Sequence, residues 1–300
     1  VRHGLQQMLW GFFKKVVIAD RLAIVVNGVY NDPSNYSGFA LILATIFFSF
    51  QIYCDFSGYS DIAIGSARVM GFELMENFKR PYFSKSIAEF WKRWHISLST
   101  WFRDYLYIPL GGNKVAKWRW YYNLLITFII SGFWHGANWT FIIWGTLHAS
   151  FLISSIILSS PKKKILRLLK IEGTSFHKIL QVGLTFLLAT FAWIFFRANN
   201  ITDAIYIITH LFTDIADYNN FDLMKLKLRG LGVSQNHILI TIILIISMEL
   251  FNLYERSGDV WLKLKSKPIW IRWSVYYLII LSILFLAPYS EVNNFIYFQF

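Results

Sequence analysis

The sequence predicts an all-α membrane protein, a polytopic bundle of transmembrane helices with re-entrant or short segments and one amphipathic cytosolic helix. Four features of the composition lead to this fold class. Of the 300 residues, 56% are hydrophobic, only 15% are charged, and the mean hydropathy is +0.45. Soluble domains are less apolar than this. Aromatic residues make up 19% of the chain, which suits the Trp and Tyr belts that line membrane surfaces.

Apolar runs in the sequence approach the length of about 20 residues that a helix needs to cross a bilayer. They are Phe39–Cys54, Tyr121–Trp134, Trp139–Leu158, Ile179–Phe196, His237–Tyr254 and Trp270–Ala287. The first two are short, and we expect the second to be tilted or re-entrant. Leu5–Tyr30 is apolar at helical spacing but also carries charges, so it is predicted to be amphipathic, at the interface or in the bundle interior. Residues 1–300 are interpreted as a single membrane-embedded domain.

The basic residues predict how the chain crosses the membrane. The net charge is +12, and Lys and Arg gather in residues 79–119, 161–178 and 255–272. The positive-inside rule places these loops in the cytosol, facing anionic lipids or ligands rather than nucleic acid. Residues 121–158 then form a hairpin whose tip lies away from the cytosolic surface. Residues 198–236 and the tail after Pro288 fall on the outer side.

The first basic loop contains a predicted amphipathic helix. Ser86 and Glu89 have the spacing of a capping box, so a helix should begin there and continue to about Ile108. Its charged side carries four candidates for substrate binding, Lys92, Arg93, Arg103 and Asp104, of which the cations suit the phosphates of a nucleotide-based acyl carrier. The alternative is a simple interfacial anchor with no ligand.

His135 is the strongest catalytic candidate. It lies at the expected membrane depth between Gly132 and Gly136, with Trp134 and Asn138 beside it as candidates for substrate contact. Ionisable residues are rare in spans and usually line a cavity or pathway. A neutral imidazole there can accept the proton of an alcohol that attacks a thioester. The alternative is a packed histidine bonded to a carbonyl group.

Several other polar residues carry weaker signals. Asp55 follows the first apolar run, and Gly58 suggests a turn there, so Asp55 is expected to cap, to snorkel or to orient another group. It is also a candidate for substrate binding. His148 either packs in the core or lines the same cavity as His135. Cys54 is the single cysteine, which excludes an intrachain disulfide. No metal-ligand motif, P-loop, GxGxxG or GxSxG supports a metal site, an NTPase, a dinucleotide enzyme or a serine hydrolase.

Four motifs resemble those of the membrane-bound O-acyltransferase (MBOAT) family. They are YCDFSGYSD at 53–61, FWKRWHISLS at 90–99, WFRDYLYIPLGG at 101–112 and GFWHG at 132–136. The segments FFRA at 195–198 and FIYFQF at 295–300 also resemble the bacterial branch of this family, the membrane subunit of alginate O-acetylation and its relatives. The motifs occur in order along nearly the whole chain.

The resemblance implies a membrane O-acyltransferase in the bacterial cytoplasmic membrane. His135 corresponds to the catalytic histidine of the family and His95 to its second conserved polar position. In the family these residues line a tunnel, which a cytosolic acyl thioester such as acetyl-coenzyme A enters from one side and an acceptor hydroxyl from the other, with no bound cofactor. A periplasmic acetyltransferase partner then receives the acetyl group and modifies the polysaccharide.

The resemblance also implies further N-terminal spans, so residues 1–300 are expected to be the C-terminal part of a longer protein. Three alternative functions stay open. Two lie within the enzyme class, D-alanyl transfer to teichoic acids and O-acetylation of peptidoglycan. The third is a polytopic transporter, although no internal repeat supports it.

Overall fold

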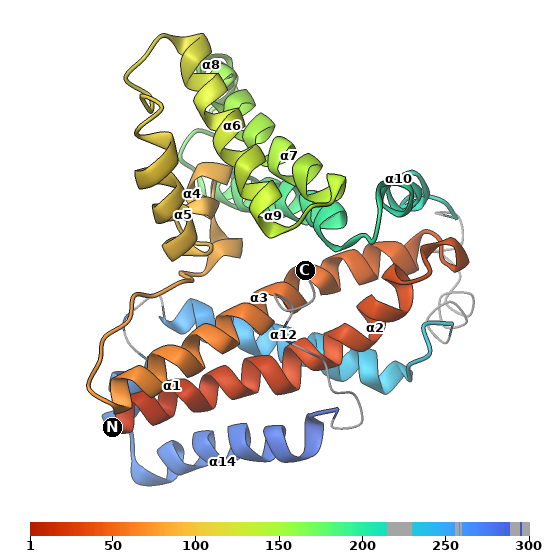
Figure 1. The fold of residues 1–300 in the computed structure, drawn as a ribbon. Coiled ribbons are helices and arrows are strands. Elements are labelled where there is room, and N and C mark those ends of the chain that lie inside the picture. Colours follow the sequence, from red (N-terminus) through yellow and green to blue (C-terminus); the bar gives the residue numbers. More distant parts are fainter. Residues whose placement is uncertain (215–229, 256–257, 259, 289–294, 296–300) are drawn as a thin grey trace. The chain divides into compact units, whose positions relative to one another are not determined.

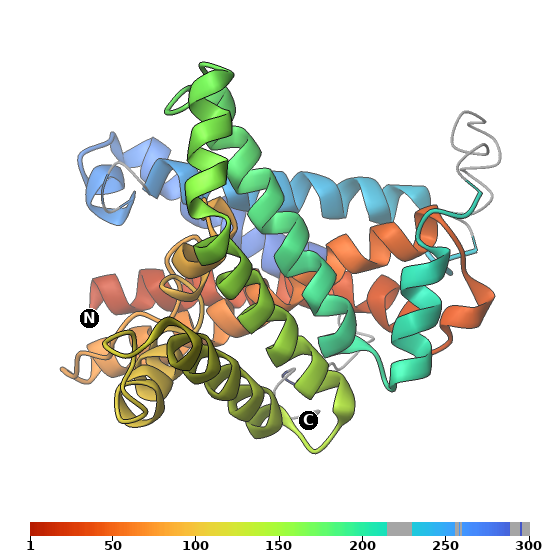
Figure 2. The ribbon, with the colours of Figure 1, turned by 90° about the horizontal axis from the view of Figure 1, so that it is seen from above.

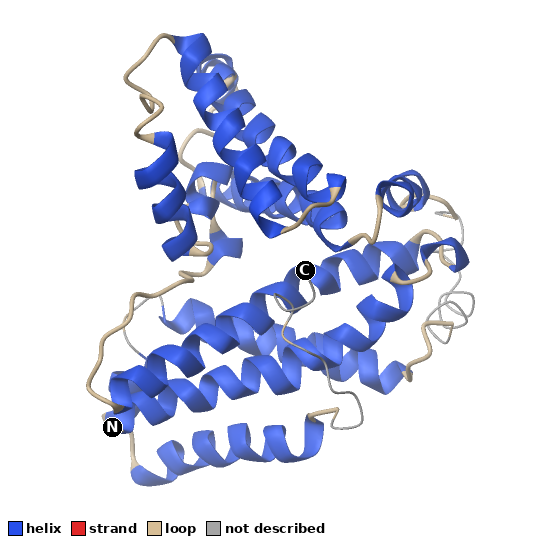
Figure 3. Ribbon diagram, in the orientation of Figure 1, coloured by secondary structure: helices blue, strands red, loops and turns tan. Residues whose placement is uncertain are grey.

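The computed structural model describes residues 1–214, 230–255, 258, 260–288 and 295, and throughout these ranges the regular elements are helices (Figure 3). The predicted all-α class is confirmed. The chain divides into two compact units, one of residues 1–76 and 206–300 and one of residues 77–205. The interpretation as a single domain stays a prediction.

Unit 1 is built around two long helical segments that lie side by side (Figure 1). The first is continuous, with α1 (Arg2–Phe12), the π-helix η1 (Phe13–Ala19) and α2 (Asp20–Tyr30), and the second is α3 (Phe39–Val69). The short helix η2 (Pro33–Asn35) connects them, and α12 (Gln235–Glu255), α13 (Val260–Lys265) and α14 (Ile269–Leu286) complete the unit. The helix α10 (Ile201–His210) contains the boundary between the units.

The turn predicted at Gly58 is wrong, because α3 continues without interruption to Val69. Gly58 instead allows two helices to touch. A Cβ atom at Gly58 would lie 2.8 Å from the Gly11 carbonyl oxygen, and one at Gly11 would lie 2.6 Å from that of Gly58. Gly4 and Gly65 form a second reciprocal pair, at 2.5 and 2.6 Å. Small residues at such crossings let helix backbones approach closely in membranes.

Unit 2 contains the segments that carry the predicted site residues other than Asp55. In chain order these are η3 (Pro81–Phe83), α4 (Ile87–Trp91), α5 (Ile96–Phe102), the π-helix η4 (Arg103–Tyr107), α6 (Lys117–His135), α7 (Trp139–Ile157), α8 (Ser159–Leu168) and α9 (Ser175–Arg197). Figure 2 shows α6, α7 and α9 as the long helices of this unit. The α6–α7 pair is the predicted hairpin.

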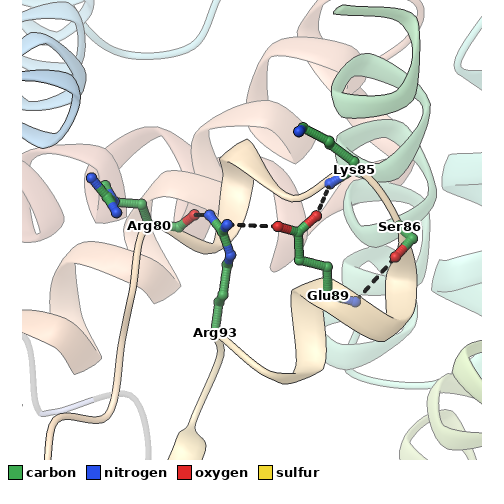
Figure 4. A network of polar contacts seen from close by, with 5 residues as sticks. All are labelled: Arg80, Lys85, Ser86, Glu89 and Arg93. Atoms are coloured by element: carbon green, nitrogen blue, oxygen red, sulfur yellow. Dashed lines mark hydrogen bonds and ion pairs between the residues drawn. The ribbon is translucent and has the colours of Figure 1, made fainter. Parts of the chain in front are cut away.

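The helix predicted from Ser86 to Ile108 begins as expected but is interrupted. The Ser86 hydroxyl accepts a 3.1 Å hydrogen bond from the Glu89 amide, and the Glu89 carboxylate accepts a 2.7 Å bond from the Lys85 amide (Figure 4). The chain then leaves the helix after Trp91, and His95 adopts a left-handed conformation with φ of 43°. The predicted apolar face is divided accordingly, since Phe90 and Trp94 are buried whereas Trp101 and Tyr105 are exposed.

Five of the described helices are long and apolar enough to cross a membrane, namely α3, α7, α9, α12 and α14. The predicted amphipathic segment Leu5–Tyr30 forms the helical run from α1 to α2. The remaining predicted run, Tyr121–Trp134, lies in α6, which the sequence predicts as tilted or re-entrant and which is not among these five. The side of the membrane on which each loop lies stays a prediction. Parts of the predicted outer segments, residues 215–229, 289–294 and 296–300, lie outside the described residues.

Candidate active site

A close crossing of α6 and α7 fixes the position of His135, the last residue of α6. A Cβ atom at Gly132 would clash with the Phe141 carbonyl oxygen, and one at Gly145 would clash with that of Phe128. Gly132 and Gly145 therefore allow the two helix backbones to approach closely. This contact sets where α6 ends and which way the imidazole of His135 is presented.

Aromatic rings surround His135. Its ring centroid lies 5.2 Å from that of Trp144 on α7 and 5.1 Å from that of Phe196 on α9. The side chain is buried, with 8% of its surface exposed, so it is not completely enclosed. Apolar walls exclude water and lower the local dielectric constant, which strengthens electrostatic interactions with a reacting group.

His95 is held in place by Asn77. The Ile96 amide donates to the Asn77 carbonyl oxygen at 3.0 Å, and the amide and hydroxyl of Ser97 donate to Asn77 Oδ1 at 3.1 and 2.7 Å. These bonds explain why the chain turns at His95 instead of continuing as a helix. His95 lies close enough to His135 for a charge on one ring to affect the other, so the structure brings the two predicted histidines together. Burial lowers the pKa of His95 to about 4, which keeps its imidazole neutral near pH 7.

Four tryptophans that the sequence reasoning did not select as site residues pack in one cluster, which contacts His135 through Trp144 and His148 through three of its rings. They are Trp91, Trp94, Trp144 and Trp193. Ring centroids of Trp94 and Trp193 are 5.0 Å apart, and those of Trp144 and Trp193 are 5.9 Å apart. Helical spacing could have predicted one of the contacts in this cluster, since residues three or four apart share a helix face. That rule pairs Trp144 with His148, but it does not show which buried tryptophans meet from different helices.

The buried N–H groups of Trp144 and His148 in this cluster have no hydrogen-bond partner among the described residues. His148 Nδ1 accepts a 3.2 Å bond from the Trp91 indole, which puts the proton of the neutral ring on Nε2. His148 Nε2 and Trp144 Nε1 are buried and unpartnered. Because a buried donor without a partner costs stability, such groups call for an explanation, and a bound ligand is one.

The remaining predicted residues beside His135 differ in their surroundings. Trp134 is 55% exposed, and its ring centroid lies 5.1 Å from that of His135. Asn138 caps α7 by accepting a 3.1 Å bond from the Thr140 amide, and its Nδ2 donates to the Asn199 carbonyl oxygen at 3.1 Å. The amide of Asn138 is thus used in structural contacts, and its role in substrate binding stays a prediction.

The predicted phosphate-binding cations are separated along the chain and partly paired. Arg93 forms a 2.6 Å ion pair with Glu89 and also contacts the Arg80 carbonyl oxygen, as Figure 4 shows. Arg103 pairs with the neighbouring Asp104 at 2.6 Å on the surface. Lys92 is exposed.

Asp55 belongs to unit 1, where its carboxylate lies 2.7 Å from Lys15 Nζ. Lys15 also pairs with Asp20 at 2.9 Å, and the buried Lys14 pairs with Asp61 at 2.6 Å. The pairs with Asp55 and Asp61 join the α1–α2 segment to α3. Within the described parts of the chain, no group of three His, Cys, Asp or Glu side chains is placed to hold a metal ion.

The curated relatives of this chain are named for three different activities. The probable alginate O-acetylase AlgI of Pseudomonas putida is 38% identical over 312 residues, which cover 99% of this chain and 61% of that protein. A peptidoglycan O-acetyltransferase of Helicobacter pylori is 43% identical over 65% of this chain and 36% of its own length. A teichoic acid D-alanyltransferase of Bacillus subtilis is 31% identical over 64% of this chain and half of its own length.

The chain thus spans only part of the length of the curated relatives it matches, about 61% for the first of them. The model of the membrane-bound O-acyltransferase family matches residues 2–202, which include both histidines and the α6–α7 hairpin. The chain belongs to the membrane-bound O-acyltransferase family.

Proposed function

We propose that this protein is a membrane O-acyltransferase that moves an acetyl group from a cytosolic thioester to an acceptor hydroxyl on the other side of the membrane. The observation that carries the proposal is the pair of buried, neighbouring histidines, His95 and His135, beside an aromatic cluster of a family member. A buried neutral imidazole is a suitable general base for a hydroxyl nucleophile.

The proposed reaction assigns one proton transfer to His135. The acceptor hydroxyl attacks the thioester carbonyl carbon while an unprotonated ring nitrogen of His135 takes its proton. The C–S bond breaks as the ester forms, and the proton passes from the imidazolium to the leaving thiolate, which departs as a thiol. His95 orients the acceptor or stabilises developing charge.

Trp144 supplies a hydrogen-bond donor in this proposal. Its indole N–H is buried with no hydrogen-bond partner in the described part of the chain, and its ring contacts that of His135. A donor kept dry and unpaired suits the oxyanion that forms on the thioester carbonyl, because it needs no reorganisation during the reaction.

Acetyl is the favoured acyl group because the relatives named as O-acetylases or O-acetyltransferases are 38–45% identical to this chain, whereas those named as D-alanyltransferases are 31% identical. We propose an extracytoplasmic polysaccharide such as alginate as the final acceptor, and peptidoglycan as the second candidate. By the same reasoning, we place the protein in the bacterial cytoplasmic membrane beside a periplasmic acetyltransferase. The donor is an acyl thioester, and no bound cofactor is required.

Transfer of radiolabelled acetyl groups tests the proposal. Membranes containing the full-length protein are given acetyl-coenzyme A labelled in the acetyl group, and covalent label is measured in the polysaccharide and protein fractions. We expect His135→Ala to lower transfer by about 10²–10⁴-fold, the usual contribution of a general base. His177→Gln, a change at a buried histidine outside the cluster, serves as the control and should retain transfer.

Two results would contradict the proposal. Near-normal transfer by His135→Ala at an equal amount of membrane-inserted protein would remove the assignment of the base. Label that crosses the membrane without becoming covalently attached would instead favour the transporter alternative.

A further inference from the structure

A second functional surface is formed by α8, which follows directly after the candidate membrane span α7. Apolar side chains on and just after this helix have no protein cover among the described residues, since Ile165, Leu168 and Leu169 are 57%, 75% and 61% exposed. At 100° per residue these three side chains share one side of the helix. An exposed apolar stripe next to a span is best covered by lipid.

The opposite side of α8 is cationic. Ser160, Lys163, Lys164 and Arg167 line an open surface groove of about 430 Å³, which is bordered by Leu168 of the apolar stripe. Arg167 donates to Glu172 at 2.9 Å, an exposed pair that offsets one of the charges. Lys163 and Lys164 remain exposed.

The two sides together match a membrane surface. Helices with a basic face and an apolar face lie in the plane of the interface, with apolar side chains among the acyl chains and cations among the headgroups. We propose that α8 is an interfacial helix that binds the phosphate groups of anionic phospholipids. A docked acidic protein would use the cations equally well, but it would leave the apolar stripe in water.

Lipid contact is tested by fluorescence quenching in reconstituted bilayers. The full chain carries Cys54→Ser and one new cysteine, Ile165→Cys on the apolar stripe or Ser160→Cys on the cationic side, labelled with a small fluorophore. We expect brominated lipid chains to quench the probe at 165 about threefold more than the probe at 160, and aqueous iodide to do the reverse. If iodide quenches both probes and bromolipid quenches neither, α8 lies off the membrane and the proposal fails, as it would for a protein-docking surface.

Headgroup selectivity is tested with the probe at 165 and bromine on either phosphatidylglycerol or phosphatidylcholine. Quenching per brominated lipid should be about fivefold greater for phosphatidylglycerol, the effect of roughly one lysine at an anionic surface. Lys163→Gln/Lys164→Gln and high salt should each remove this preference. The matched double variant Lys265→Gln/Lys267→Gln, at two exposed lysines of unit 1, should keep it. Equal quenching by both lipids in the unsubstituted helix would overturn the headgroup assignment.

Discussion

The indole nitrogen of Trp91 on α4 donates a hydrogen bond to Nδ1 of His148 on α7 across 3.2 Å. The two rings also meet edge to face, with centroids 4.9 Å apart. Trp91 ends the short helix that precedes His95, and α7 provides Trp144 beside His135. The bond therefore links the segments that position the two candidate histidines, and its loss should be measurable.

A double-mutant cycle measures this link. Trp91→Phe removes the donor and leaves His148 Nδ1 buried and unpaired, so we expect a loss of about 1–3 kcal/mol in the free energy of unfolding. His148→Phe leaves the indole unpaired at a similar cost. Because both changes remove one bond, the double variant should cost clearly less than the sum of the single variants. The measurement is thermal unfolding in detergent, followed by light scattering, and additive costs would show that the bond contributes nothing.

The sequence predicted the helices of unit 2 well, because apolar periodicity and the Ser86 cap are local signals. It did not predict the interruption at His95, since that turn depends on bonds to Asn77, which lies well before it in the chain. For the same reason Gly58 was interpreted as a turn, when its partner is a glycine of a different helix. Motifs identified both histidines, whereas the contact of Trp144 with His135 exists only in the folded chain.

Stability should depend on pH through His95. Its pKa is lowered to about 4 by burial, against about 6.5 in an unfolded chain, so the unfolded state binds the proton more readily. Stability is therefore complete above pH 6.5 and is lost as the pH falls from about 6.5 toward 4, by up to about 3 kcal/mol. His95→Asn tolerates the left-handed conformation and does not titrate, so its unfolding temperature should change less between pH 7 and pH 5. Equal changes in both proteins would rule out a contribution from His95.

The glycine crossing in unit 1 should tolerate no added methyl group. Gly11→Ala and Gly58→Ala each place a Cβ within 3 Å of a carbonyl oxygen, and we expect each to cost about 1–3 kcal/mol. Gly28→Ala is the matched control, because Gly28 is helical, exposed and has nothing within 4 Å of the added atom. That change should be neutral or stabilising by up to about 1 kcal/mol.

The reactivity of Cys54 measures the difference in stability between these glycine variants. It is the single cysteine, it lies on α3, and it is fully buried, so a thiol-reactive dye labels it only when unit 1 opens. The labelling temperature should fall for the two crossing variants and should stay or rise for Gly28→Ala. Identical shifts for all three variants would show that the close approach is unimportant.

The ion pairs of Lys15 predict an order of effects. Lys15→Met leaves the carboxylates of Asp20 and Asp55 without their shared cation, so we expect it to cost about 3 kcal/mol. Asp20→Asn and Asp55→Asn should each cost less, because Lys15 keeps one partner. The dye assay at Cys54 measures the order. A different outcome would support the predicted role of Asp55 in substrate binding. In that case Lys15→Met and Asp55→Asn would have similar labelling temperatures, and the acetyl-transfer assay would show a raised KM for Asp55→Asn alone.

Trp144→Phe separates a catalytic donor from a packing residue. Phenylalanine keeps an aromatic ring against His135 but removes the unpaired indole N–H, and removal of a buried donor that has no partner should not lower stability. We expect kcat to fall about 100-fold, the typical loss of one oxyanion donor, with little change in KM. Trp91→Phe is the matched contrast. The indole N–H of Trp91 is bonded to His148, so loss of this bond should lower the unfolding temperature. If Trp144→Phe lowers the unfolding temperature as much as Trp91→Phe while kcat stays normal, the indole packs the cluster and the oxyanion is stabilised elsewhere.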